Sequence, residues 1–413
     1  MTRLHTSKLA YLLALSTFAP CVKAQDLVVH GGETKRIQVN DVLTYDTVIV
    51  EPGGVLRLDS TIRATLHVAR GMRIEGTLDL SGEDARPQRH SGGGALQAQG
   101  GAGGPLGGWG GTGHPTIGAS CAQGGSGLDT IGAVPQTGGG GGGDTAVGLV
   151  AGSSRYAGGG GGGRLAADQP VTAPPLALAN LGLVATPGFP GAQQVQSALV
   201  PGSPPRGGTS GALVFVDNNP LNDFWGSRFD PVTQTTIVGE LFLPIAGRGG
   251  GGGGDSITSS SFPQTPYNPY NEIKGSGGGG GGGLGVIVTP RLEIVGAGAI
   301  RANGGMGAPS ADLTGNPRPG GAGGGGSGGM LVIQVTTLDM RSANQRAITA
   351  LGGRGGQGMG NLHDTTAAGG NGGPGLVQLH MVNGPGGILL PPGKLISDMT
   401  APTPYLLQPI VGL

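Results

Sequence analysis

The stretch Gly277-Gly-Gly-Gly-Gly-Gly-Gly-Leu284-Gly-Val286-Ile-Val288 decides the fold, because a run of glycine passes directly into an apolar segment. Leu292-Glu-Ile294 and Ile300-Arg-Ala302 follow a few residues later. Apolar residues two positions apart lie on the same face of a β-strand. The stretch therefore predicts a glycine-rich excursion, a buried strand, a second strand and a Gly-Gly exit.

The same unit occurs again further along the chain. Leu292 lies 46 residues before Leu338, and Ile300 lies 48 residues before Ile348, each pair at equivalent positions of two successive units. Partial copies of the unit occur at 78–82, 207–216 and 369–379. Repeats of about 20–50 residues are typical of stacked architectures, in which one unit cannot bury its apolar face alone.

Short strands are also expected near the beginning of the chain. Between Asp46 and Leu80, apolar residues come in pairs two positions apart, namely Val48/Val50, Leu56/Leu58, Leu66/Val68, Met72/Ile74 and Leu78/Leu80. Turn signals such as Pro52-Gly-Gly54 separate these pairs. Regularly spaced short strands indicate an all-β solenoid or sandwich. Together with the repeat, they predict a parallel β-solenoid with glycine-rich excursions.

The overall composition excludes several other classes of protein. Glycine supplies 93 of the 413 residues, about 22% against a usual ~7%. A helical protein is excluded, because each helical glycine costs about 1 kcal/mol relative to alanine. Collagen needs glycine at every third position, whereas glycine here comes in blocks. The 24 Lys and Arg balance the 24 Asp and Glu, so the chain lacks the basic footprint of a nucleic-acid-binding protein.

The glycine runs have two interpretations, which the sequence leaves open. The runs occupy 138–143, 158–163, 249–254, 277–283 and 323–326. Glycine loses the most backbone entropy on ordering, which favours flexible loops. Flexible linkers usually contain serine and charged residues, however, and these runs nearly lack both. The alternative is packed polyglycine II: extended, left-handed helices with three residues per turn, whose N–H and C=O groups pair with neighbouring helices.

Residues 1–24 are typical of a secretory signal peptide. Arg3 and Lys8 provide its positive charge, residues 9–15 form a short apolar core, and the segment ends on a small-residue cleavage site at Ala24. No later stretch is apolar over the ~18 residues of a transmembrane helix. The expected location is therefore outside the cytoplasm or on the cell surface.

Cleavage after Ala24 changes the charge and the cysteine count. The mature chain begins at Gln25, carries a net charge of −3 and keeps Cys121 as its single cysteine. A single cysteine forms no internal disulfide, so Cys121 is expected to be a small buried residue. A lipid anchor on Cys21 is the less favoured alternative to cleavage at Ala24.

These features resemble two known groups of proteins. The signal peptide, the segment Val50-Glu-Pro-Gly-Gly-Val-Leu-Arg-Leu58 and the segment Gly323-Gly-Gly-Gly-Ser-Gly-Gly-Met-Leu-Val-Ile333 resemble large glycine-rich secreted or surface proteins of bacteria. The glycine runs are similar to the polyglycine layers at the tips of phage tail-fibre adhesins. This second resemblance implies that loops beyond a glycine layer carry receptor specificity. The signal peptide departs from the phage pattern.

Two insertions without long glycine runs supply the candidate recognition residues. The first insertion, 217–230, places aromatic rings beside carboxylates and amides, a combination that suits sugar faces and hydroxyl groups. The second insertion, 262–271, has three rings and three prolines between two glycine runs. The candidates are Asp223, Phe224, Trp225 and Phe229 in the first insertion, and Phe262, Tyr267 and Tyr270 in the second. As an alternative to recognition, the first insertion is a hairpin whose rings cover the end of the core, and the second is a stiff Pro-rich connector.

Motif searches find no candidate catalytic, cofactor-binding or metal-binding residues. Gly325-Gly-Ser327-Gly-Gly329 matches a nucleophile elbow only formally, because it lies in a glycine run with no helix after it. The histidines are not spaced as a metal pair. We therefore expect a protein that is not an enzyme and has no cofactor.

The expected organisation and function follow from these observations. The segments are a signal peptide 1–24, solenoid rungs 25–82, a glycine-rich region 83–210, a strand with aromatic insertions and glycine runs 211–283, glycine/strand repeats 284–382 and a Pro-rich tail 383–413. We expect a secreted structural or adhesive protein of a bacterial cell surface or matrix. Its partners are surface or matrix polysaccharide or protein, or copies of itself, and not nucleic acid. The alternatives are a carbohydrate-binding or carbohydrate-active β-helix protein with acids clustered near Asp79 or Asp339, and an ice-binding protein.

Overall fold

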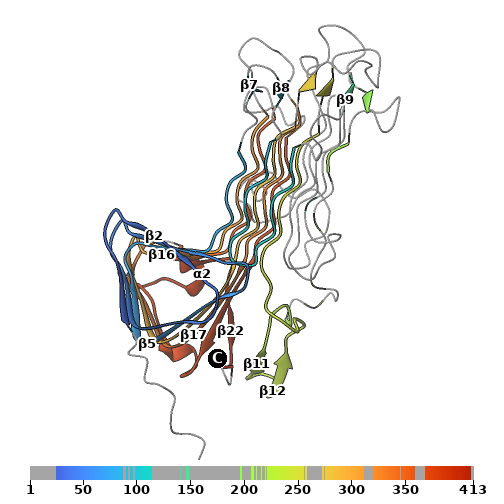
Figure 1. Ribbon diagram of the computed structural model, residues 1–413. Coiled ribbons are helices and arrows are strands. Elements are labelled where there is room, and N and C mark those ends of the chain that lie inside the picture. Colours follow the sequence, from blue (N-terminus) through green and yellow to red (C-terminus); the bar gives the residue numbers. More distant parts are fainter. Residues whose placement is uncertain are drawn as a thin grey trace, which may run out of the picture.

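The structure is a computed structural model in which β-strands predominate (Figure 1). It describes residues 25–86, 90–91, 94–95, 98–113, 140, 146–147, 196–197, 206–208, 211, 215, 219, 221–254, 256–257, 272–273, 275–310, 320–344, 346–358 and 368–410. The expected signal peptide and Cys121 lie outside these residues. Helical structure in the described part amounts to the short segments η2 (Pro385–Gly387) and α2 (Ile396–Met399). The expected all-β class is confirmed.

A parallel eight-stranded sheet forms one side of the body of the protein. Its strands lie in the order β1 (Gln25–Val29), β3 (Leu43–Val50), β5 (Ala64–Ile74), β15 (Leu284–Gly296), β17 (Met330–Ala343), β19 (Leu376–Met381) and β22 (Tyr405–Leu407), and β20 (Ile388–Leu389) also pairs with β17. All neighbouring strands run parallel. The excursion 83–283 is therefore inserted between two adjacent strands, because β5 and β15 pair directly.

A parallel six-stranded sheet forms the other side. Its strands lie in the order β2 (Thr34–Gln38), β4 (Val55–Asp59), β6 (Thr77–Asp79), β16 (Ala299–Arg301), β18 (Ile348–Thr349) and β21 (Thr400–Ala401). The chain alternates between the sheets, so that β1 is followed by β2, β3 by β4, β5 by β6, β15 by β16 and β17 by β18. Both sheets thus stack the same successive units in the same order.

The strand register confirms the repeat predicted from the sequence. Leu292 is paired with Leu338 in the larger sheet, and Ile300 is paired with Ile348 in the smaller one. The partial copy at 78–82 aligns too, because Leu78 is the other partner of Ile300. Equivalent apolar side chains therefore lie above one another through the stack.

The main core lies where the inward faces of the two sheets meet. Strand β4 shows the pattern: Leu56 and Leu58 are buried, whereas Arg57 between them lies on the outer face. Residues from both sheets, including Ile294 and Ile348, belong to one buried cluster. Each such aliphatic side chain contributes about 1.5–3 kcal/mol when it is fully buried. The period of two seen in the sequence thus sets the inside and outside of the body.

A second apolar cluster covers the outer face of the larger sheet. Val286 and Val332 project from this face and pack with Phe215, Leu241 and Ile245. The covering segment also contains the hairpin of β11 (Ser227–Asp230) and β12 (Thr235–Val238). Because both of its faces are covered here, the larger sheet has continuously buried stretches such as Leu376–Met381.

The glycine-rich segments form an ordered array beside the sheets. We define the glycine array as residues 80–86, 98–104, 107–113, 247–254, 275–283, 302–310, 321–329, 350–358 and 369–375. Figure 1 shows these extended segments running side by side from the sheets to a far end. Backbone hydrogen bonds of 2.6–3.0 Å join neighbouring segments. The described glycine-rich segments are therefore packed against one another, as the second interpretation of the runs predicts.

The hydrogen bonds of segment 275–283 recur every third residue. Ser276, Gly279 and Gly282 all donate to segment 321–329. The intervening N–H groups donate to two other neighbours, 107–113 and 80–86, and carbonyl groups of 275–283 accept from 98–104, 247–254 and 302–310. A three-residue period is that of an extended polyproline-II-type helix, whose successive backbone groups point in three directions. Segment 275–283 is thus enclosed on all sides by other segments.

Close packing explains why these positions are glycine. A methyl group on Gly279 would overlap the carbonyl oxygen of Gly305, and one on Gly280 would overlap that of Ala102. The same holds for Gly326, where the obstacle is the carbonyl oxygen of Gly280. Only hydrogen side chains let these backbones approach to hydrogen-bonding distance.

The segments of the array lie in the same order as the strands to which they are connected. Segments 275–283, 321–329 and 369–375 lead into β15, β17 and β19, while 80–86, 302–310 and 350–358 follow β6, β16 and β18. Neighbouring strands thus have neighbouring glycine segments. Residues 388–407, expected as part of a Pro-rich tail, instead add β20, β21 and β22 to the two sheets.

Candidate functional site

The second aromatic insertion is closed at its base by a strand pair at the far end of the array. Strands β13 (Ser256–Ile257) and β14 (Glu272–Ile273) pair antiparallel and enclose residues 258–271. They extend a small sheet that also contains β9 (Ala146–Val147) and β10 (Gln196–Ser197), and β9 lies at the far end in Figure 1. The candidate residues Phe262, Tyr267 and Tyr270 lie outside the described residues.

The first insertion lies against the body, near the C-terminal strand β22. Asp223 and Phe224 are fully buried, Trp225 is partly buried and Phe229 is half exposed. The side chains of Asp223 and Phe224 therefore face the protein interior. This agrees with the alternative interpretation of this insertion, a hairpin that covers the core. Among these four candidates, Phe229 therefore presents the most accessible ring.

Aromatic and polar contacts hold this insertion in place. The ring centroids of Phe224 and Tyr405 are 5.5 Å apart, and the Arg228 guanidinium lies 5.8 Å from the Phe224 centroid. Trp225 meets His380 edge-on at 6.3 Å. Burial, with a contribution from the nearby Asp223 carboxylate, raises the pKa of Tyr405 to about 12. The Tyr405 phenol is therefore neutral at physiological pH and packs as an amphipathic ring.

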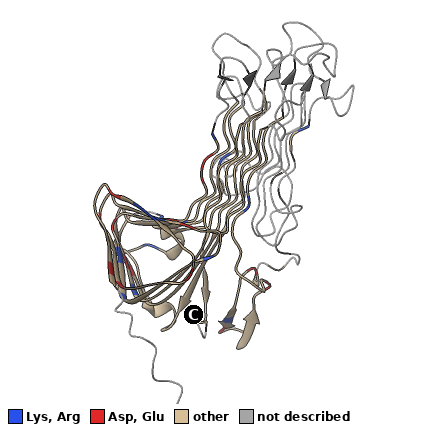
Figure 2. Ribbon diagram, viewed as in Figure 1, with Lys and Arg blue, Asp and Glu red and all other residues tan. Residues whose placement is uncertain are grey.

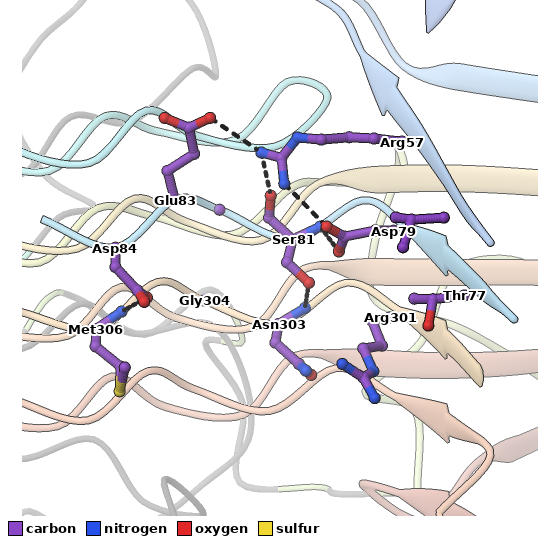
Figure 3. A pocket seen from close by; sticks show the side chains of 12 residues that line it. Arg57, Thr77, Asp79, Ser81, Glu83, Asp84, Arg301, Asn303, Gly304 and Met306 are labelled. Carbon is purple, nitrogen blue, oxygen red and sulfur yellow. Dashed lines mark hydrogen bonds and ion pairs between the residues drawn. The ribbon is translucent and has the colours of Figure 1, made fainter. Parts of the chain in front are cut away.

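A charged groove lies where the outer face of the smaller sheet meets the glycine array (Figure 3). Its volume is about 660 Å³. It is lined by Val55, Arg57, Thr77, Asp79, Ser81, Gly82, Glu83, Asp84, Arg301, Asn303, Gly304 and Met306. The strands β4, β6 and β16 supply one wall, and the segments that follow β6 and β16 supply the other.

Arg57 organises the carboxylates of this groove. Its guanidinium donates to Asp59 Oδ1 at 3.0 Å, Asp79 Oδ2 at 2.9 Å and Glu83 Oε1 at 3.5 Å, and to the Ser81 carbonyl at 3.2 Å. Its side chain is only 13% exposed. These bonds fix the guanidinium and leave the acids as acceptors with defined positions. Figure 3 shows Arg57 reaching across Ser81 between Asp79 and Glu83.

The opposite wall of the groove is held by side-chain bonds to the array backbone. The Asn303 N–H donates to Ser81 Oγ at 3.1 Å, and the Met306 N–H donates to Asp84 Oδ1 at 2.7 Å. The Met306 side chain itself is 48% exposed, and Arg301 is exposed. The groove thus combines fixed acceptors, guanidinium donors and one accessible apolar side chain.

A second acidic position, Asp339 on β17, lies beside a smaller cavity of about 280 Å³. The Arg341 side chain donates to it from Nη2 at 2.7 Å and Nε at 3.0 Å, the Arg341 N–H donates at 3.3 Å, and Arg291 Nη2 lies at 3.5 Å. The Arg341 hydrogen bonds hold the pKa of Asp339 below its usual range. Asp339 is therefore ionised at neutral pH, which suits an ion pair or hydrogen-bond acceptor rather than a proton donor.

Ser327 of the formal nucleophile-elbow motif is fully buried in the array. Its Oγ accepts a hydrogen bond of 2.7 Å from the Arg248 N–H. The hydroxyl therefore completes backbone pairing between two segments. Among the described residues, no group of three or more His, Cys, Asp or Glu is arranged to hold a metal ion.

The sequence named Asp79 only under the carbohydrate-active alternative, which requires acids clustered near Asp79 or Asp339, and it did not predict the groove. Its residues come from chain segments more than 200 positions apart, and parallel pairing of Asp79 with Arg301 brings them together. One signal was present: in Asn303-Gly-Gly-Met306-Gly-Ala and Leu351-Gly-Gly-Arg354-Gly-Gly, every third residue has a larger side chain. That local period marks the outward-facing positions of segments 302–310 and 350–358, in which Met306 and Arg354 are exposed.

The chain has no match among protein-family models, curated proteins or solved structures. Within the described ranges, no helix is long and apolar enough to cross a membrane. Figure 2 shows most Lys, Arg, Asp and Glu on the sheets, with few along the array.

Proposed function

We propose that the two parallel sheets are faces of one β-solenoid. The alternation of the chain between the sheets from β1 to β6 and from β15 to β18, the matching strand order and the shared core support this arrangement. Each coil then consists of one strand from each sheet. A stack of this kind gains stability from contacts between adjacent coils.

We further propose that the protein is a secreted, non-catalytic structural or adhesive component of a bacterial cell surface or matrix. The observation that carries this proposal is the hydrogen-bonded glycine array, which separates the solenoid from the loop enclosed by β13 and β14. At ~3.1 Å per residue, a nine-residue segment such as 275–283 spans about 28 Å. A rigid spacer of this length presents a loop away from the body at little entropic cost on binding.

Secretion is supported by the position of the first strand. Strand β1 begins at Gln25, the residue that follows the expected cleavage site. Removing residues 1–24 would therefore leave both sheets whole. N-terminal sequencing of the exported protein is expected to begin at Gln25, and an N-terminus within the β1 sequence would contradict this assignment.

The adhesive role is tested by removing the far-end loop. In the mature chain 25–413, residues 259–270 are replaced with Gly-Gly, which keeps β13 and β14. In a matched control, the β11–β12 turn 231–234 is replaced with Asn-Gly, which suits a two-residue hairpin. We expect the first variant to unfold at the wild-type temperature but to lose binding of labelled protein to bacterial surfaces, and the control to bind normally. Unchanged binding by the first variant would exclude recognition by this loop.

Ice binding, the other sequence-based alternative, gains little support from the array surface. Asp84, Met306 and Arg354 occupy outward positions of three adjacent segments. A face with charged and flexible side chains differs from the flat, uncharged face that this hypothesis requires. Absence of thermal hysteresis in solutions of the purified protein is the expected result.

A further inference from the structure

We propose that the groove around Arg57 binds a neutral, hydroxyl-rich ligand, namely a segment of a polysaccharide chain. This inference concerns the junction of the smaller sheet and the array, and it is independent of the far-end loop. It rests on the charge balance, the hydrogen-bonding groups and the shape of the groove.

The charge balance disfavours an anionic ligand. Two arginines, Arg57 and Arg301, face three carboxylates, those of Asp79, Glu83 and Asp84. The Arg57 guanidinium is already engaged by carboxylates and a carbonyl group. An anion would therefore meet acidic neighbours, with Arg301 as the one exposed cation among the residues that line the groove. A strongly cationic ligand would in turn meet both guanidinium groups.

Hydroxyl groups match the donors and acceptors of the groove. A carboxylate accepts about four hydrogen bonds in total, so the contacts to Asp79, Glu83 and Asp84 leave acceptor capacity on each. Arg301 adds guanidinium donors at the same surface. A sugar hydroxyl both donates and accepts, so adjacent hydroxyls of one ring can pair with a carboxylate and a guanidinium at once.

The groove also has an apolar side. Met306 is 48% exposed, and Val55 and Thr77 also line the groove. The C–H face of a sugar ring can pack on a flexible thioether side chain while its hydroxyls meet the charged wall. This arrangement provides an apolar contact for one face of a pyranose ring and hydrogen-bonding groups for its hydroxyls.

The size and rigidity of the groove fit a short stretch of a longer chain. Its volume of about 660 Å³ lies within the range of ~300–1,000 Å³ common for ligand sites. The groove is open to solvent, so a polymer can enter and leave without passing an enclosure. One wall lies on paired strands and the other on array segments, and hydrogen bonds of Arg57 and Ser81 join the two. Such preorganisation lowers the entropic cost of binding.

Calorimetric titration of the mature protein with hexasaccharides tests the proposal. The probes are cellohexaose, maltohexaose and chitohexaose as neutral chains, and a galacturonate hexamer as an acidic one. We expect at least one neutral probe to bind, and Glu83→Gln and Arg301→Met each to weaken its binding about tenfold, the effect of removing a hydrogen bond to a charged group. Arg354→Ala is the matched control, an exposed arginine on a neighbouring array segment outside the groove, and it should leave affinity unchanged.

Three outcomes of the titrations with wild-type protein and groove variants would overturn the proposal: no binding of any neutral probe, binding of the acidic probe alone, or neutral binding that both groove variants leave unchanged. The variant lacking 259–270 separates this site from the adhesive loop. It should bind the hexasaccharide normally even though surface adhesion is lost. Retention of adhesion with loss of hexasaccharide binding would instead argue against both assignments.

Discussion

At the scale of single residues, backbone spacing in the array decides which side chains are allowed. Gly279 donates to Gly324 and accepts from Gly250, each at 2.9 Å, and its side-chain position faces the Gly305 carbonyl group. Positions at the edge of the array follow another rule, because side-chain oxygens accept backbone N–H groups there. There Asn303 accepts from the Leu351 N–H and Asn371 from the Gly355 N–H, both at 2.8 Å.

Gly279→Ala is expected to destabilise the protein by about 3 kcal/mol or more. Overpacking costs ~1–3 kcal/mol, and separating the backbones weakens hydrogen bonds worth about 1 kcal/mol each. Gly386→Ala is the control, since a methyl group there meets no atom within 4 Å, and it should change stability by less than about 0.5 kcal/mol. Denaturant unfolding of both variants measures the difference. Equal effects would show that the array does not restrict side-chain size.

Met306→Asn is expected to strengthen the outer edge of the array. Met306 lies three residues after Asn303, and Arg354 lies three residues after Leu351, so an asparagine at 306 should accept from the Arg354 N–H as Asn303 does from Leu351. A gain of about 0.5–1 kcal/mol would slow exchange of the Arg354 amide about two- to fivefold. The reciprocal change, Asn303→Met, should speed exchange at Leu351. No change at either amide would contradict the capping role.

At the scale of elements, the strands were predictable and their distant partners were not. Apolar pairs such as Leu56/Leu58 and the 46- and 48-residue spacings marked the strands and their register, because alternation and repetition are local properties. Pairing of β5 with β15 depends on where a long excursion returns, and no local pattern specifies that. The groove was missed for the same reason. The sequence also could not show whether Phe224 is buried, because an aromatic ring in a hairpin can either cover the core or face solvent.

The hairpin segment is expected to depend on Phe224 for its attachment to the larger sheet. Phe224 is fully buried against Tyr405, whereas Phe242 in the same segment is 90% exposed. Phe224→Ala should cost about 3–5 kcal/mol, and Phe242→Ala less than about 0.5 kcal/mol. Thermal unfolding of the two variants provides the comparison. A small effect of Phe224→Ala would mean that its ring is not part of the packed interface.

His380 is expected to make stability depend on pH. Burial lowers the pKa of this imidazole from 6.5, and its Nδ1–H donates to the Gln408 carbonyl at 2.6 Å. The folded state therefore holds the neutral form, so its stability is complete above pH 6.5 and decreases as pH falls from 6.5 toward the lower folded pKa. Below that folded pKa, His380 contributes no further change.

Comparison with His380→Asn isolates this effect, because asparagine keeps a donor for Gln408 but does not titrate. The wild-type protein should lose more stability than the variant between pH 7.5 and pH 5.5, measured by denaturant unfolding. The other histidines are present in both proteins and cancel in the comparison. Parallel pH profiles would contradict a role for His380.

At the scale of the whole molecule, the glycine array extends from the two sheets and consists almost entirely of backbone. The stack of strands sets the order of the glycine segments, and the segments hydrogen-bond to one another in that same order. Composition alone suggested disorder, because it does not show that the runs recur in register with strands. The central claim is that the described runs, at 249–254, 277–283 and 323–326, form a hydrogen-bonded, closely packed array rather than flexible loops.

Amide hydrogen exchange of the mature protein tests this claim most directly. The account predicts that the amides of Gly278–Gly283 and Gly323–Gly329 are protected as strongly as those of the adjoining strands β15 and β17, because each set is hydrogen-bonded and buried. Exchange of these glycine amides at the rate of an unstructured chain, with β15 and β17 still protected, would contradict it.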